Sequence, residues 1–170
     1  MIAGRTVIKA QVVVVFYSKT KARPLYQRVG VILTRFLVGG GGIEHVSLML
    51  LIDNIKPMVY NVTKLASSKW ATARSVHKDQ IPCVAINLGY VDVDPEYLDS
   101  IKPIRFSLIR FLLYCKVTRF FLRWKPKRIC TMKIVEIIRD LGLDVNYHVM
   151  PIDLLKELKE NADDTDCWEG

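Results

Sequence analysis

Two residues that stand far apart in this sequence have the side chains of a nucleophile and its base. Cys130 follows the cations Lys127 and Arg128 and opens the patterned segment "CTMKIVEIIRDLGL". His45 opens the apolar run "HVSLMLLI". A thiol and an imidazole need no particular separation in the sequence, because the fold brings them together. We therefore take Cys130 and His45 as the candidate pair for attack on a carbonyl carbon.

The segment that begins at Cys130 predicts a helix. Gly142 ends it, and its apolar residues recur at the spacing of one helix face: Ile134, Ile137, Ile138 and Leu141. Cys130 then lies in or just before the first turn, where free N–H groups and the positive end of the helix dipole favour thiolate over thiol. Lys127 and Arg128 act in the same direction. The position suits a reactive sulfur.

Structural roles are the alternative for both residues. Cysteine is among the residue types most often buried, and the start of a core helix is an ordinary place for it. A histidine on a buried strand needs a hydrogen-bond partner, but that partner can be purely structural. Of the other histidines, His77 is expected in a loop and His148 at a strand edge, and neither is assigned a catalytic role.

The elements around these residues predict an α+β protein, in which a small antiparallel sheet has helices packed beside it. The expected strands are 11–17, 45–52, 57–65, 83–88 and 145–150, and the second and third form a hairpin. The expected helices are 26–38, one capped by Asp94, 104–124, the helix of Cys130 and one started by Pro151. Residues 1–160 are expected to form a single domain, and residues 161–170 an acidic, flexible tail.

The charge predicts a class of partner but no activity. The chain has 170 residues, and its 25 Lys and Arg against 17 Asp and Glu give a net charge of +8. Such a surface should attract nucleic acid, anionic lipid or an anionic cell-wall polymer. A basic surface is expected on and just after the helix 104–124, where it could hold a membrane or an assembly partner: Arg105, Arg110, Lys116, Arg119, Arg123, Lys125, Lys127 and Arg128.

Aromatic residues stand among these cations, but they do not favour a reader of nucleic-acid sequence. Phe120, Phe121 and Trp124 are at helical spacing, which is more typical of a core than of a platform for stacked bases. Sequence-specific binding of nucleic acid is therefore not expected.

The cysteines and histidines lack the spacing of a metal site. Cys83, Cys115, Cys130 and Cys167 include no C-x-x-C pair, so we expect neither zinc nor another cofactor. The apolar run 12–16 is too short for a secretory leader, and cations interrupt 104–124, which does not fit a transmembrane span. The expected location at synthesis is the cytoplasm, with free thiols, and incorporation into a particle is compatible with this.

Four stretches in a fixed order resemble a known family. "EHVSLML", "MVYNVT", "ICTMKIVEIIRDLGL" and "MPIDLLKELK" resemble the circularly permuted NlpC-like branch of the papain-like thiol hydrolases, over about residues 12–159. The resemblance implies a fold in which the cysteine helix packs on the sheet that carries the histidine. It also implies that Cys130 is the nucleophile, His45 the base and Asn61 the polar residue that orients the base.

The sequence departs from the family pattern at two of these positions. Thr131 follows the cysteine where serine is common, and Asn61 stands where glutamate is frequent. An amide stabilises an imidazolium less than a carboxylate does, but it can still orient the ring. These departures are also compatible with a protein that has the fold of the family but no longer catalyses a reaction.

Whether His45 and Asn61 share a face depends on the hairpin register. Two odd-numbered residues share a face when paired residues sum to an even number. A turn centred on Asp53 satisfies this and puts Asn61 beside His45, whereas a turn centred on Ile55 puts Asn61 several residues away.

The chemistry expected from this pattern is acyl transfer through a thioester. The Cys130 thiolate would attack an amide or ester, N–H groups at the helix start would hold the oxyanion, and His45 would return the proton. The resemblance suggests cell-wall (peptidoglycan) peptides as substrates, with lipid esters or amides second. The alternative is a catalytically silent structural or binding protein on the same scaffold, such as a component of a bacterial or viral particle, that uses its basic surface.

Overall fold

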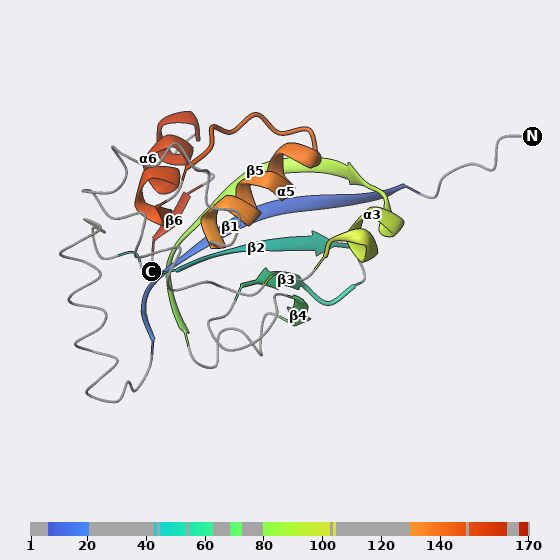
Figure 1. Cartoon of the computed structure of the whole chain (residues 1–170), viewed down its shortest axis with the longest axis horizontal. Helices are drawn as coiled ribbons and strands as arrows, with labels where there is room; N and C mark the ends of the chain where they lie inside the picture. The colour runs from blue at the N-terminus through green and yellow to red at the C-terminus, as the bar shows by residue number, and fades with distance from the viewer. Residues whose placement is uncertain are drawn as a thin grey trace, which may run out of the picture.

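The computed structural model describes residues 7–20, 43, 45–53, 55–62, 69–72, 80–102, 104, 130–148, 150–162 and 167–169. Within these residues the protein is α+β, with a six-stranded antiparallel open sheet and three helices (Figure 1). The strand order across the sheet is β4-β3-β2-β1-β5-β6. The expected fold class and the expected antiparallel sheet are therefore confirmed.

The strands differ widely in length. They are β1 (Ile8–Thr20), β2 (His45–Ile52), β3 (Met58–Asn61), β4 (Lys69–Thr72), β5 (Gln80–Val93) and β6 (Cys167–Glu169). The helices are α3 (Pro95–Ser100), α5 (Cys130–Asp140) and α6 (Pro151–Asn161). The two longest strands, β1 and β5, pair with each other, and β2 pairs with the other edge of β1. The central strands thus form one continuous support for shorter elements on both sides.

One face of the sheet carries the main core. Alternate residues of a strand point to the same face, and the even-numbered residues from Ala10 to Phe16 of β1 and from Val46 to Leu50 of β2 are fully buried apolar side chains on this face. They pack with the apolar stripes of α5 and α6, in one cluster that includes Val14, Phe16, Val46, Leu48, Leu50, Ile134, Ile138 and Leu154. Figure 1 shows α5 lying across the central strands. This packing fixes the position of the first turn of α5.

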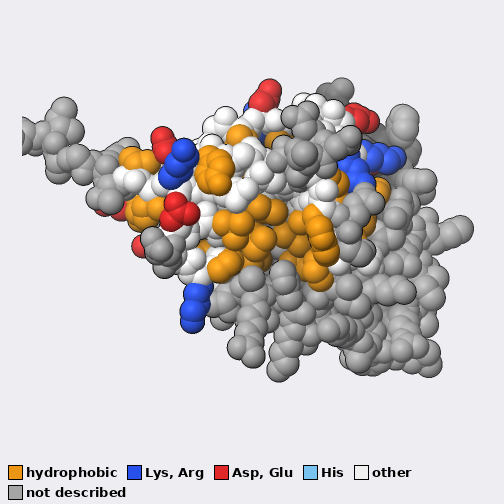
Figure 2. Space-filling model, turned by 180° about the vertical axis from the view of Figure 1, so that it is seen from behind, with side chains coloured by type: hydrophobic (Ala, Val, Ile, Leu, Met, Phe, Trp, Pro, Cys, Tyr) orange, Lys and Arg blue, Asp and Glu red, His pale blue; other side chains and the backbone are white. Residues whose placement is uncertain are grey.

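The opposite face carries a smaller cluster. Val13, Val15, Tyr17 and Val59 are buried there, and Met49, Leu51, Ala71 and Ala85 pack against them. Figure 2 shows this side of the molecule, where hydrophobic side chains gather at the centre of the view. Met49 and Leu51 of β2 belong to this face.

The helix ends have identifiable signals. The Asp94 side chain accepts a hydrogen bond from the backbone N–H of Glu96 at the start of α3, and Pro95 is the first helical residue. Gly142 follows α5 with a φ of 85°, a backbone conformation that residues other than glycine rarely adopt. Pro151 begins α6. These three predicted boundaries are confirmed.

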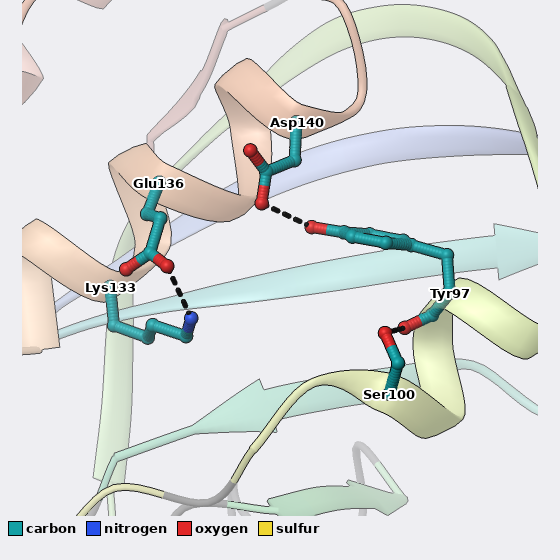
Figure 3. A network of polar contacts seen from close by, with 5 residues as sticks. All are labelled: Tyr97, Ser100, Lys133, Glu136 and Asp140. Atoms are coloured by element: carbon teal, nitrogen blue, oxygen red, sulfur yellow. Dashed lines mark hydrogen bonds and ion pairs between the residues drawn. The ribbon is translucent and has the colours of Figure 1, made fainter.

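Polar contacts join α3 to α5 (Figure 3). The Tyr97 hydroxyl of α3 donates a hydrogen bond to Asp140 of α5 over 2.8 Å. Within α5, Lys133 and Glu136 form an exposed ion pair at 2.8 Å. A second contact, from the Trp70 indole N–H to the Leu98 carbonyl, connects β4 to α3. Through these contacts α3 connects the end of α5 to the edge of the sheet.

Three expectations about the fold need correction. Residues 145–148 do not form a strand, because side-chain contacts to α5 and α6 hold them instead. Cys167–Glu169, expected in a flexible tail, pair with β5 as the edge strand β6. Strand β4 was not expected at all. The helices expected at 26–38 and over nearly all of 104–124 lie outside the described residues, as do His77 and Cys115.

No helix among the described residues is both long enough and apolar enough to cross a membrane.

Candidate active site

Cys130 is the first residue of α5, and its side chain is only 5% exposed. The apolar face of α5 packs on β2, so the start of the helix lies against the start of that strand. The backbone N–H of Val46, the second residue of β2, lies close enough to the Cys130 sulfur to lower the pKa of the thiol. The sulfur therefore lies directly beside the strand that carries His45.

His45 is the first residue of β2 and is half-buried. Its imidazole lies beside the Cys130 thiol, whose pKa it lowers. On the other side, its Nε2 atom lies 2.5 Å from Oδ1 of Asn61. An amide oxygen can only accept a hydrogen bond, so Nε2 carries the hydrogen and Nδ1 is the nitrogen left for the thiol. This tautomer is the one that a base facing Cys130 needs.

Asn61 is the last residue of β3 and is 8% exposed. The pairing of Leu48 with Tyr60 centres the hairpin on residue 54. This register differs from the two turn centres considered from the sequence, Asp53 and Ile55. It places Asn61 opposite Ser47, so that His45 and Asn61 share a face as diagonal neighbours within side-chain reach.

The surroundings of Cys130 favour its thiolate. Burial alone raises the pKa of the Cys130 thiol. The hydrogen bond and positive charge of His45, the Thr131 hydroxyl and the Val46 N–H outweigh burial and hold that pKa below its ordinary value. Lys127 and Arg128, expected from the sequence to add to this effect, lie outside the described residues.

Two further residues complete a polar cluster that the sequence did not reveal. The Tyr17 ring lies beside the His45 imidazole, with 5.7 Å between the ring centroids and 34° between the planes. The Tyr17 hydroxyl lies 2.9 Å from Oγ of Ser47. Ser47 could have been predicted, because the alternation of β2 puts it on the same face as His45. Tyr17 could not, because its position depends on how β1 pairs with β2.

His148 is occupied elsewhere in the fold. Its imidazole forms an ion pair and hydrogen bond with Glu157 of α6. Asn146 donates to the same carboxylate from both its backbone and its side chain, at 2.9 Å and 2.8 Å. His148 therefore anchors the segment between α5 and α6, and it lies in a loop rather than at the expected strand edge.

The part of the chain that the structure describes contains no group of three or more His, Cys, Asp or Glu side chains that could hold a metal ion. Cys83, Cys130 and Cys167 are not joined in disulfide bonds.

Comparison of this chain with protein-family models, with curated proteins and with solved structures gives no match. The functional argument therefore rests on the residues and their geometry.

The arrangement can transfer a proton away from the sulfur. The Asn61 amide accepts a hydrogen bond from the His45 ring, and the same ring lowers the pKa of the Cys130 thiol. The first N–H groups of α5 have no acceptor within the helix, so they can stabilise negative charge that develops near the sulfur. These are the parts required for nucleophilic attack on a carbonyl group.

Proposed function

We propose that this protein is a cysteine hydrolase or acyltransferase of the permuted, NlpC-like papain type, and that it acts on an amide or ester bond through a thioester. The single observation that carries the proposal is that the His45 ring, which Asn61 holds by a hydrogen bond, lies beside Cys130 and lowers the pKa of its thiol. A structural cysteine and a structural histidine would not need to lie beside each other.

The first half-reaction forms the thioester. The Cys130 proton passes to Nδ1 of His45, the sulfur forms a bond to the carbonyl carbon, and the carbonyl π electrons move to oxygen. The N–H groups at the start of α5 stabilise this oxyanion. When the carbonyl re-forms, the bond to the leaving amine or alcohol breaks, and His45 gives that group its proton.

The second half-reaction releases the acyl group. His45 removes a proton from water or from an acceptor hydroxyl or amine, whose oxygen or nitrogen then bonds to the thioester carbon. The carbon–sulfur bond breaks, and His45 returns the proton to Cys130. Throughout both steps Asn61 accepts the Nε2 hydrogen and keeps Nδ1 directed at the reaction.

The fold supports this reading as much as the side chains do. The nucleophile begins a helix that packs on an antiparallel sheet, and the base begins the strand beneath that helix. The orienting amide ends the next strand of the same sheet. This order is the one that the resemblance to permuted papain-like hydrolases implies. A cell-wall peptide is the first substrate class proposed, and a lipid ester or amide the second.

One observation favours a second candidate function. Cys130 is 5% exposed and belongs to the main hydrophobic cluster, as a purely structural cysteine would. The alternative is a catalytically silent protein on the same scaffold, which binds an anionic surface or an assembly partner through its basic segment.

The two candidates differ in the reactivity of the sulfur. The experiment treats the folded protein with iodoacetamide near neutral pH and maps the alkylated cysteines by mass spectrometry. The hydrolase proposal expects Cys130 to react faster than Cys83 and Cys167, and expects His45→Ala to slow the Cys130 reaction about tenfold or more. Equal rates at all three thiols, with no effect of His45→Ala, would support the silent protein.

A further inference from the structure

We propose that Tyr17 and Ser47 act as a positioning pair, which holds the His45 imidazole in the orientation that proton exchange with Cys130 requires. This inference rests on the proposed function and adds residues to it that do not touch the sulfur.

The first step of the argument is the contact between the two rings. Tyr17 and His45 are directly paired across β1 and β2. Their rings are tilted by 34°, and their centroids are 5.7 Å apart. Tyr17 is 1% exposed, so its ring is fixed by packing. Asn61 fixes one edge of the imidazole at Nε2, and the Tyr17 ring lies beside the imidazole and limits its rotation.

The second step is the way in which Tyr17 itself is held. Its hydroxyl hydrogen-bonds to Oγ of Ser47 at 2.9 Å, and Ser47 is fully buried. Ser47 follows His45 by two residues on the same face of β2, and it lies opposite Asn61 in the hairpin. The Tyr17 ring is thus tied to the strand of His45 both at the ring and at the hydroxyl.

The third step is that packing alone does not require these hydroxyl groups. The buried neighbours of Tyr17 on this face are Val13, Val15 and Val59. When both partners of a buried hydrogen bond are replaced by apolar groups of similar shape, stability often changes little. Phenylalanine at position 17 and alanine at position 47 would therefore fill the same space. The hydroxyl groups of Tyr17 and Ser47 fix the orientation of the Tyr17 ring and are not needed to bury it.

The Tyr17 hydroxyl also remains a hydroxyl while the site works. Burial raises the pKa of Tyr17 to about 12, and the hydrogen bond from Ser47 opposes that rise only in part. The Tyr17 hydroxyl consequently stays protonated over the pH range in which a cysteine and a histidine exchange a proton.

The test measures the ionisation of Cys130 in Tyr17→Phe, Ser47→Ala and the double variant. Thiolate is followed by its ultraviolet absorbance during a pH titration, as the difference between each protein and the same protein carrying Cys130→Ala. This readout reports the thiolate directly and is independent of the alkylation experiment above. Tyr60→Phe is the matched control, because Tyr60 is also 1% exposed but packs with the main core on the other face.

The expected result is a rise of about half a unit to one unit in the Cys130 titration midpoint in each single variant. The double variant should shift no further than the larger single shift, because both substitutions break the same contact. Tyr60→Phe should change the melting temperature without moving the midpoint. A structural role for Tyr17 and Ser47 would lower stability and leave the midpoint where it was.

The outcomes separate this inference from the proposed function. If the wild-type midpoint is low and both single variants keep it, the positioning pair is overturned and the hydrolase proposal stands. An equal shift in Tyr60→Phe also overturns the pair, because the effect would then follow from any lost buried hydroxyl. If wild-type Cys130 titrates like an ordinary thiol, the proposed function fails and the pair fails with it.

Discussion

His45 and Asn61 are joined by a contact of 2.5 Å between Nε2 and Oδ1, although they are diagonal rather than direct neighbours in the β2–β3 hairpin. The direct neighbour of Asn61 is Ser47, so the amide reaches along the sheet toward the ring. Asn61 is also buried, which means that the His45 N–H has its partner away from solvent.

The first prediction concerns the loss of this amide. Asn61→Ala leaves the Nε2 hydrogen of His45 without its acceptor, and it should lower the free energy of unfolding by about 1–3 kcal/mol. It should also slow alkylation of Cys130, because the ring is then free to turn away from the sulfur. Chemical denaturation and alkylation kinetics measure the two effects. Asn61→Asp retains an acceptor, so alkylation as slow as in Asn61→Ala would contradict the orienting role.

The second prediction concerns pH. The pKa of Cys130 is held below its ordinary value, so the sulfur is deprotonated at pH values where an ordinary thiol, with a pKa of about 8.5, still carries its proton. Alkylation should therefore reach half its maximal rate below that pH. In His45→Ala, burial still raises the pKa while the largest opposing cause is gone, and the midpoint should move upward. A midpoint that is unchanged in His45→Ala would show that His45 does not govern the thiolate.

The third prediction concerns the anchor between α5 and α6. The pKa of Glu157 is lowered, because contacts from Asn146 and His148 outweigh the opposing effect of burial. A carboxylate with a depressed pKa contributes stability above its unfolded value, and that contribution is lost as pH falls through the folded value. Glu157→Gln should thus be less stable than wild type by about 1 kcal/mol at neutral pH.

The effect of Glu157→Gln should disappear at low pH. The difference in free energy of unfolding between wild type and Glu157→Gln should shrink as pH falls below about 4.3, the pKa of a glutamate in the unfolded chain. Thermal unfolding at several pH values measures it. Exposed Glu96 is a suitable control, and Glu96→Gln should show no such dependence. A gap that stays constant down to acid pH would refute the linkage.

The fourth prediction concerns the end of α5. Gly142 has a φ of 85°, and a Cβ atom placed there would meet nothing within 4 Å. Gly142→Ala should therefore cost only the backbone strain of a positive φ, about 1 kcal/mol. Since Cys130 lies at the opposite end of the helix, its titration midpoint should not change. A large shift in that midpoint would mean that the two ends of α5 are coupled.

The fifth prediction concerns the contact between α3 and α5. Tyr97→Phe removes the hydrogen bond to Asp140 and keeps the ring, so it should lower the free energy of unfolding by about 1 kcal/mol. Combining it with Asp140→Ala, which removes the acceptor, in a double-mutant cycle tests the pair directly. Fully additive losses would show that the two side chains do not stabilise each other.

Periodicity was enough to predict the elements that carry the candidate site. The alternation of β2 and the helical spacing after Cys130 each reflect burial of one face against the main core, so strand and helix were placed correctly. The role of Asn61 was predicted from the resemblance to a family and not from periodicity. Local pattern could not give the register, because the centre of the hairpin at residue 54 depends on the geometry of its turn.

Contacts between distant segments explain the remaining errors. The segment "VNYHVM" at 145–150 resembles a strand, but Asn146 and Tyr147 are held by Glu157 and Arg139. Strand β5 continues past Gly89, where the sequence suggested an end, because glycine takes a φ of 90° at an irregularity opposite β1. The nearness of Tyr17 to His45 likewise required the pairing of β1 with β2.

The even-numbered and odd-numbered residues of β2 have different roles. Val46, Leu48 and Leu50 pack against the helices, whereas His45 and Ser47 belong to the polar cluster. On the proposed function, an inherited change at His45 alters the reactivity of Cys130, while the even-numbered residues still hold α5 and α6. A descendant of this protein can therefore lose its chemistry and keep its fold.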